Sequence, residues 1–252
     1  MSKFVKTANL PDNVDELIIG ERYAELLHRG LERNGVEPLY LPDNPNIDRR
    51  LSSHADMSVL HMGGAALFLA PYLRETRFEK DLREIGAELI FPEISQSAKY
   101  PRDAQLNLCA AGDVFFCKHS CSAESAVEYF ASVRGLRTIN IRQGYARCSM
   151  CVVTNGAVIT ADRGMYAGAL DNGLDALLIS AGYIELRGFE YGFIGGSAFK
   201  LSADRLAFTG KLDTHPDKTA IIDFLRAHKV EPIFLTELPL FDIGSAIPLT
   251  EK

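Results

Sequence analysis

The chain has 252 residues, of which 47% are hydrophobic and 24% are charged, as is typical of a folded globular protein. Its net charge is −6 and no stretch is rich in Lys or Arg, which argues against nucleic acid and anionic membranes as partners. No apolar run is long enough to span a bilayer, and residues 1–10 lack the apolar core of a secretory signal. Because the five cysteines are an odd, scattered set, we expect a reduced, cytoplasmic protein.

A repeating order of elements begins near the N-terminus. Residues 15–20 read as a strand, 21–34 as a helix with an apolar stripe, and 36–41 as a second strand. From residue 54 the order becomes strand, turn, strand, helix, strand. The expected ranges of this second unit are 56–62, 66–69, 72–85 and 87–91, with a turn at Gly63-Gly64.

The same order returns three more times. Alternating polar and apolar residues over 103–109 predict a strand with one solvent-exposed face and one buried face. The third unit is expected to have a hairpin at 103–117, a helix at 123–133 and a strand at 137–141. The fourth has a hairpin at 147–160 turning at Asn155-Gly156, a short helix near 165–172, a strand at 176–180 and an added strand or insert at 183–189. The fifth has strands at 194–201, 205–209 and 231–235, and a helix at 216–228.

One strand, 242–249, is left over at the C-terminus, and the first unit lacks its leading strand. Pairing residues 242–249 with 17–20 would supply that strand and close a ring. The second strands recur at roughly 45 residues, a period typical of propellers. We therefore expect an α/β fold, a single domain over 1–252 built as a five-bladed, pseudo-symmetric β/α propeller closed by its N- and C-terminal strands. The alternative is an open α/β sheet.

Three segments carry a resemblance to a known superfamily. They are His54-Ala-Asp56 followed by Met-Ser-Val-Leu, Tyr100-Pro-Arg-Asp103, and the closing segment from Asp242 to Leu249. With the five units, they resemble the penteins, the guanidino-group-modifying enzymes that include arginine deiminases, dimethylarginine hydrolases and amidinotransferases. The resemblance implies a guanidinium-binding carboxylate at Asp56 or Asp103, and it places the closing segment where active members carry a nucleophilic cysteine.

The sequence departs from the superfamily at the catalytic positions. No cysteine lies beyond Cys151, and Ser245 or Gly244 occupies the neighbourhood of the missing nucleophile. Residues 192–197, which begin the fifth unit, contain no histidine, and His215 lies at a predicted helix start instead. The resemblance therefore implies a divergent branch, in which the usual cysteine chemistry is absent or has moved.

Aligning the units on their hairpin turns places Asp56, Asp103 and Asp242 at similar positions. Carboxylates gathered at one place repel each other unless they share protons or a cation, and a guanidinium can bind a carboxylate in a bidentate manner. We therefore expect these three residues to bind a cationic ligand, although each could instead stabilise a turn. Asn107 shares a face with Asp103, where it either orients the ligand or belongs to a structural network.

The candidate catalytic residues are few. His54 precedes Asp56 by two positions and is a candidate general base, while Cys148 and Ser245 are candidate nucleophiles. Cys148 and Cys151 would face opposite sides of a strand, which argues against zinc binding by the Cys-Ser-Met-Cys motif, and we expect no metal and no cofactor. Gly195-Gly196 is interpreted as close packing at the propeller axis.

The predicted function is binding of a small cationic ligand, a guanidino or amino compound, in a central pit. If the protein is an enzyme, it would act as a hydrolase or amidinotransferase on such a compound. The alternative is a catalytically inactive propeller that serves as a structural or protein-binding module. The ligand-binding interpretation requires Asp56 and Asp103 to converge in space.

Overall fold

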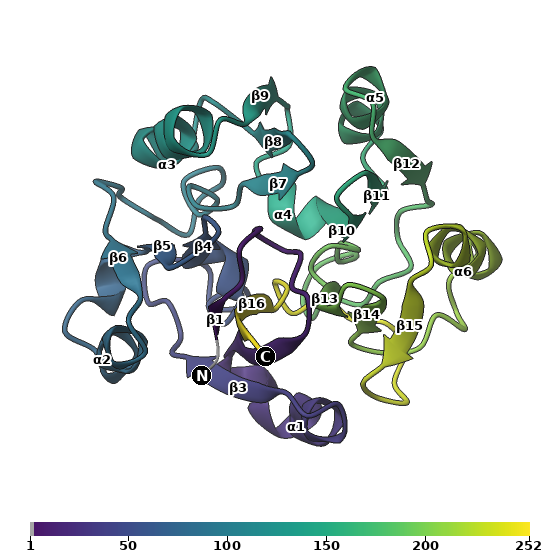
Figure 1. The fold of residues 1–252 in the computed structure, drawn as a ribbon, viewed down its shortest axis with the longest axis horizontal. Coiled ribbons are helices and arrows are strands. Elements are labelled where there is room, and N and C mark those ends of the chain that lie inside the picture. The colour runs from purple at the N-terminus through teal and green to yellow at the C-terminus, as the bar shows by residue number, and fades with distance from the viewer. Residues whose placement is uncertain (1–2) are drawn as a thin grey trace.

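The computed structural model describes residues 3–252, which form a mixed α/β fold with five small sheets. Figure 1 shows the five sheets placed around a common centre, with the longer helices on the outside. The α/β class expected from the sequence is confirmed, whereas a single open sheet is not formed by the described residues.

Four of the sheets have the same three-stranded pattern. In each, the first two strands are antiparallel and the third runs parallel to the second. These sheets consist of β4 (Val59–His61), β5 (Ala66–Leu69) and β6 (Glu88–Ile90); β7 (Cys109–Ala111), β8 (Val114–Cys117) and β9 (Arg137–Asn140); β10 (Met150–Thr154), β11 (Ala157–Thr160) and β12 (Asp175–Leu178); and β13 (Ala198–Ser202), β14 (Arg205–Phe208) and β15 (Glu231–Phe234).

The fifth sheet joins the two ends of the chain. Its order is β1 (Lys3–Phe4), β16 (Ile247–Glu251), β2 (Val14–Gly20) and β3 (Glu37–Leu41). β16 is antiparallel to β2, with Ile247 opposite Ile18, and β2 is parallel to β3. The C-terminal strand therefore takes the place of the leading strand that the first unit lacks, and the expected pairing of the terminal strands is confirmed.

The main helix of each unit connects its second strand to its third. These helices are α1 (Ala24–Arg33), α2 (Arg77–Glu84), α3 (Glu124–Glu128, continued by a π-helical turn, Tyr129–Val133), α5 (Arg163–Asp171) and α6 (Lys218–Ala227). Each buries apolar residues at helical spacing, such as Leu27 and Leu31 of α1 or Ile221 and Leu225 of α6. No described helix is long and apolar enough to cross a membrane.

The structure differs from the sequence prediction where the first strand of each sheet begins. Residues 103–108 form turns, and only Cys109 starts a strand. Residues 55–57 form a 3-10 turn, residues 146–149 a short helix, and residues 242–246 a loop before β16. Asp103 and Asn107 are buried, so the predicted solvent-exposed face is wrong; their side chains instead bond to neighbouring segments, which competes with the strand ladder.

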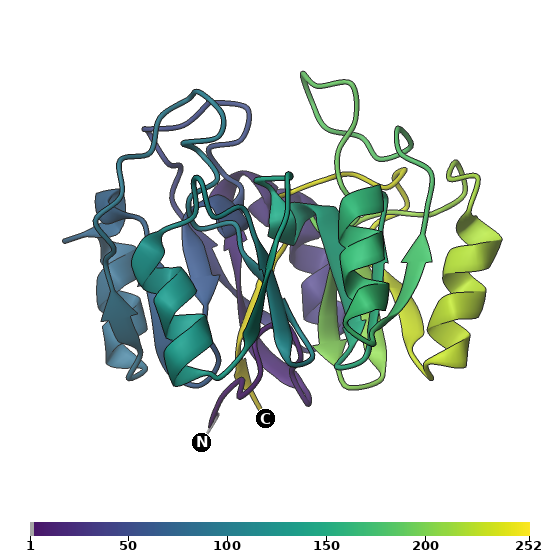
Figure 2. The ribbon, with the colours of Figure 1, turned by 90° about the horizontal axis from the view of Figure 1, so that it is seen from above.

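The two ends of the sheets carry different segments of the chain. Figure 2 shows long loops gathered on one side of the molecule and both termini on the opposite side. Residues 183–189, predicted as an added strand or insert, belong to one of these long loops, which continues to residue 193; its regular pairing is a single bridge between Glu185 and Phe241. The irregular segments that precede the first strands thus deliver their polar side chains beneath a set of loops.

Substitution of Gly195 tests the close packing between neighbouring units. A Cβ atom at Gly195 would lie 2.3 Å from the carbonyl oxygen of Arg147 and 2.4 Å from that of Met150, which confirms the close packing expected for this glycine. Because these are backbone atoms, we expect Gly195→Ala to lower the free energy of unfolding by about 2 to 3 kcal/mol in urea denaturation. Gly156, with no atom within 4 Å of its would-be Cβ, is the control, and Gly156→Ala should change stability by under about 0.5 kcal/mol. Equal effects of the two substitutions would contradict this packing argument.

Candidate functional site

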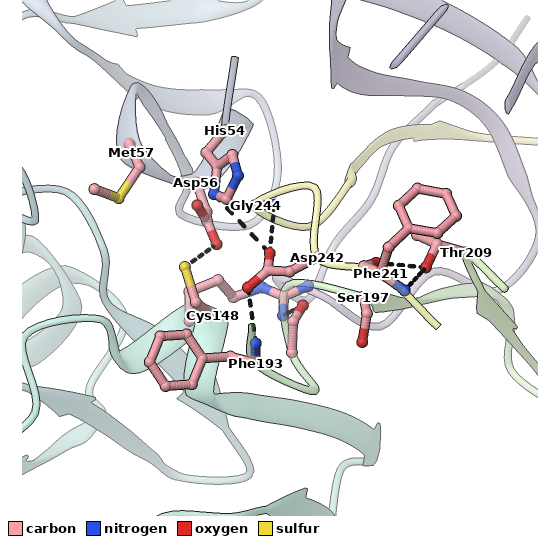
Figure 3. Close-up of polar contacts among 12 residues, drawn as sticks. His54, Asp56, Met57, Cys148, Phe193, Ser197, Thr209, Phe241, Asp242 and Gly244 are labelled. Carbon is pink, nitrogen blue, oxygen red and sulfur yellow. Dashed lines mark hydrogen bonds and ion pairs between the residues drawn. The ribbon is translucent and has the colours of Figure 1, made fainter. Parts of the chain in front are cut away.

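Four segments that precede first strands bring polar side chains together. His54 and Asp56 flank the start of the 3-10 turn before β4, and Asn107 lies in the turn before β7. Cys148 lies in the short helix α4 (Ala146–Ser149) before β10, and Asp242 lies in the loop before β16. All five residues are buried, and Figure 3 shows His54, Asp56, Cys148 and Asp242 facing one another.

Asn107 holds two of these segments together. Its Oδ1 accepts hydrogen bonds from the backbone N–H groups of Arg147 (2.7 Å) and Cys148 (3.2 Å), which lie in the first turn of α4 and have no partner within the helix. Its Nδ2 donates to the Asp56 carbonyl at 3.3 Å and lies 3.2 Å from Cys148 Sγ. The amide therefore positions the thiol against the carboxyl group: Cys148 Sγ donates to Asp56 Oδ2 at 2.9 Å (Figure 3).

Asp242 is held by the backbone. Its Oδ1 accepts from the N–H of Gly244 and its Oδ2 from the N–H of Phe193, each at 2.8 Å. His54 Nδ1 lies 3.9 Å from Asp242 Oδ1. A Cβ at Gly196 would lie 2.0 Å from the same oxygen, so a glycine is required there for the carboxyl group to fit.

A cavity of about 310 Å³ opens onto this cluster. His54, Cys148 and Asp242 form its polar end. The remaining walls are largely apolar and aromatic, and they are Leu51, Met57, Tyr145, Leu186, Phe189, Tyr191 and Phe193, together with Glu190. Among the described residues that line this cavity, none is Lys or Arg.

Burial drives the site towards its uncharged forms. It raises the pKa of Asp56 to about 7, helped by the nearby Asp242 and opposed by the hydrogen bond from Cys148. Burial also raises the pKa of Asp242, lowers that of His54, and raises that of the Cys148 thiol well above its ordinary value. For Cys148, the two carboxyl groups of Asp56 and Asp242 act in the same direction as burial. The site therefore combines acidic groups with a shortage of positive charge.

Several polar atoms of the cluster have no hydrogen-bond partner. His54 Nε2 and Asp56 Oδ1 are both buried and unpaired. His54, Asp56 and Cys148 each offer a potential ligand atom for a metal ion, and these three atoms lie within 4.8 Å of one another. Unpaired buried polar atoms are uncommon in native proteins, so their concentration here marks the cluster as a candidate site.

The other two predicted site residues lie off the cavity. Asp103 accepts a hydrogen bond from the Tyr145 hydroxyl at 2.6 Å, so it reaches the cavity only through the ring of Tyr145. Burial raises the pKa of Asp103. Ser245 is buried with φ +63°, and its hydroxyl donates to the Ala246 carbonyl at 3.2 Å. The convergence of Asp56 with Asp103, which the ligand-binding interpretation required, is therefore not found among the contacts of the described site residues. The acidic group that acts on Asp56 is Asp242, which raises its pKa.

Sequence reasoning missed the cavity walls. Tyr145 and Phe193 contact each other, with ring centroids 6.1 Å apart, and Phe189 and Tyr191 follow in the same long loop. The only signal in the sequence was the density of aromatic residues among glycines over 182–193, which has no strand or helix period. Cys151, in contrast, lies in β10 within an apolar core cluster, away from Cys148.

The fold defines the class of protein. It is similar to the amidinotransferase from Microseira wollei in the saxitoxin biosynthetic pathway, with a TM-score of 0.58, 12% identity, and 98% of this chain and 97% of that chain covered. The inosamine-phosphate amidinotransferase from Streptomyces griseus gives 0.58 and 13%, over 97% and 96% of the chains. The dimethylarginine dimethylaminohydrolase from Pseudomonas aeruginosa, in complex with citrulline, gives 0.54 and 12%, over 89% and 94%. The chain has the pentein fold, which confirms the resemblance seen in its sequence.

The sequence also matches a family that is a smaller group than the proteins that share this fold. Residues 18–247 match the model of a family of unknown function, DUF6873, and the chain belongs to that family. No curated protein sequence matches the chain.

The pH dependence of stability tests the buried Asp56. Its pKa is about 7 in the folded protein against 3.8 ordinarily, so between these values the folded state keeps a proton that the unfolded chain has released. Stability from this proton is present at low pH and is lost as the pH rises through about 7. We expect Asp56→Asn to gain stability relative to wild type from about pH 5 to about pH 8, by on the order of 2 kcal/mol, in urea denaturation.

The matched control for this experiment is Asp171→Asn, at an exposed carboxylate at the end of α5. Its stability should follow the wild-type curve at every pH. If Asp56→Asn also followed that curve, the raised pKa of Asp56 would be refuted.

Proposed function

We propose that residues 1–252 form one domain, a five-bladed β/α propeller, which binds a small cationic guanidino or amino compound in its central cavity. The five strand–strand–helix–strand units and the pairing of β16 with β2 support the propeller. One observation carries the binding proposal: a buried acidic group, Asp242, lies in the wall of a cavity whose described lining contains no Lys or Arg, and a second, Asp56, lies directly behind Cys148 and within electrostatic reach of Asp242.

A bound cation would compensate the negative charge that the carboxyl groups of this site carry when they are ionised. Asp242 raises the pKa of Asp56, and both carboxyl groups raise the pKa of Cys148, because positive charge compensates them only in part. The Arg147 guanidinium lies close enough to lower the pKa of Asp56, but its donors go to Asn9 Oδ1 and to backbone carbonyls. A guanidinium or ammonium group would stabilise the ionised carboxylates and donate hydrogen bonds to their oxygen lone pairs, with a planar fit for guanidinium.

The walls of the cavity suit the remainder of such a ligand. Tyr145, Tyr191 and Phe193 present aromatic rings to it, and aromatic faces attract cations as well as apolar groups. A volume of about 310 Å³ is at the small end of ligand sites. In this proposal Asp103 acts as a positioning residue that holds Tyr145, and Asn107 as one that holds Cys148.

A second candidate function is covalent modification of the bound compound, favoured by the thiol of Cys148 in the cavity wall. The cation would lower the pKa of Cys148, and the thiol proton would pass to Asp56. The sulfur would then form a bond to the guanidino carbon while one C–N bond breaks and the departing amine takes up a proton. Water or a second amine would release the product, giving hydrolysis or amidino transfer. His54 is the candidate acid–base group here, and Ser245, bonded to the Ala246 carbonyl, is the weakest of the candidate nucleophiles.

Two further expectations from the sequence remain proposals. We propose a reducing, cytoplasmic setting, supported by five unpaired cysteines in the described structure. The alternative function, an inactive propeller that binds another protein, becomes the better account if the cavity takes no cation. The solved relatives fit the first account: their names specify amidinotransferases, an agmatine deiminase with substrate bound, and a dimethylarginine hydrolase with citrulline.

A thermal-shift panel tests cation binding. The compounds are arginine, agmatine, methylated arginines, guanidinoacetate and simple polyamines, each with wild type and Asp242→Asn. A ligand at about 100 times its Kd should raise the melting temperature of wild type by about 5 to 10 °C, because it binds only the folded state. The shift should vanish in Asp242→Asn and persist in Asp171→Asn. Should every compound leave the melting temperature unchanged, the binding proposal fails.

Alkylation of Cys148 tests its role as a nucleophile. We compare a cationic reagent, chloroacetamidine, with neutral iodoacetamide, and read the modified peptides by mass spectrometry. The carboxylates should concentrate the cation and lower the pKa of the thiol, so Cys148 should react with it faster, relative to Cys121, by about 10-fold or more. Asp242→Asn should abolish this preference. Equal labelling of both cysteines by both reagents would remove Cys148 as a nucleophile.

A further inference from the structure

We propose that His54, Asp56 and Cys148 form a binding site for a thiophilic divalent metal ion of the zinc class, with the fourth coordination position open to the cavity. The site is distinct in chemistry from the organic-cation site, although both use the same polar end of the cavity. The metal site can exist without the proposed function. Its competition with an organic cation, however, rests on the proposed function.

The first observation behind this proposal is the set of potential ligand atoms. The three residues offer one imidazole nitrogen, one carboxylate oxygen and one thiolate sulfur, all of which are ligands of zinc. Donors at about 2.0 to 2.3 Å from one tetrahedral zinc ion lie about 3.3 to 3.8 Å apart. The three atoms lie within 4.8 Å of one another, so small side-chain rotations bring them to ligating distance. Their mixed chemistry separates them from a cluster of acids alone.

The unpaired atoms are a second, independent observation. Asp56 Oδ1 and His54 Nε2 have no hydrogen-bond partner, although Asp56 and His54 are each only 2% exposed. Leaving such atoms unpaired costs free energy that a ligand would recover. A metal ion bound between these residues would occupy lone pairs that the described protein leaves free.

The surroundings are organised as those of metal ligands are. Asp242 Oδ1 lies 3.9 Å from His54 Nδ1, too far for a hydrogen bond but close enough for its charge to act on the imidazole ring (Figure 3). Asn107 holds Cys148 in place through its backbone and sulfur contacts. Supporting groups of this kind fix the direction of a ligand before the metal arrives.

The cavity supplies the entry path and the open position. His54 and Cys148 both line it, while Asp56 lies behind them. Three protein ligands with a fourth position facing a cavity is the arrangement of reactive zinc sites, in contrast to the closed four-ligand structural sites. Because ligation deprotonates the thiol, the bound metal blocks Cys148 as a nucleophile and supplies the positive charge that an organic cation would otherwise bring.

Cobalt spectroscopy tests the site directly. Reduced protein, treated with a chelator and then freed of it, is titrated with Co²⁺, and thiolate-to-cobalt charge-transfer absorption is followed in the near ultraviolet. We expect saturation at one equivalent and loss of the band on addition of Zn²⁺. Competition against a chromophoric chelator then gives the Kd for Zn²⁺, which should rise by about 100-fold or more in Cys148→Ser.

Two controls keep the test decisive. Cys109→Ser, at another buried cysteine, should retain the band and the Kd, while His54→Gln and Asp56→Asn should each weaken Zn²⁺ binding with the fold intact by circular dichroism. Absence of the charge-transfer band in wild type, or its survival in Cys148→Ser, would overturn the proposal.

The two cation sites can fail separately. If a guanidino compound shifts the melting temperature but no metal binds, the metal site is wrong and the proposed function stands. If Zn²⁺ binds through Cys148 but no organic cation does, the proposed function fails alone. If both bind, saturating Zn²⁺ should abolish the thermal shift of the organic cation, and its persistence would refute the shared site.

Discussion

The antiparallel pairing of β16 with β2 is the constraint on which the candidate site depends. It returns the end of the chain to its beginning and so places the loop before β16 beside the turn before β4. Two contacts join these segments: the Asp56 N–H donates to the Gly244 carbonyl at 3.1 Å, and Gly244, at φ +69°, leaves room for His54, whose Cβ would lie 2.1 Å from a Cβ at that position. Without the pairing, Asp242 would belong to a free terminus and would not face His54.

The protein retains buried acids that a stability argument alone would remove. Ionised carboxyl groups cost free energy in an apolar environment. Burial therefore raises the pKa values of Asp56 and Asp242. Groups with such shifts are concentrated at functional sites, where the cost is offset by binding or chemistry. Here the shifts coincide with a cavity, a buried thiol and unpaired polar atoms, and the combination favours a site for positive charge over a purely structural cluster.

The pentein fold is compatible with more than one outcome, because a fold does not determine a function. In this chain the cavity thiol comes from α4 and not from the closing strand, where the resemblance to the penteins led us to look. The proposed organic cation and the proposed metal ion would compete, because both would bind the carboxyl group of Asp56 at the same end of the cavity.

The sequence by itself determined the α/β class, the five repeated units and the pairing of the terminal strands, because hydrophobic period and turn residues are local signals. It also singled out Asp56 and Asp242, which with Asp103 lie at similar points of their units, His54, which lies two positions before Asp56, and Cys148, a candidate nucleophile. Only the tertiary structure decided which of them meet. Cys148 reaches Asp56 across 92 positions because residues 146–149 form a helix, where the sequence predicts the start of a hairpin strand at residue 147. Asp103 was separated from the cavity by Tyr145, and Ser245 was directed to a backbone carbonyl. Long-range hydrogen bonds overrode the local pattern at these positions, and no period in a single sequence encodes them.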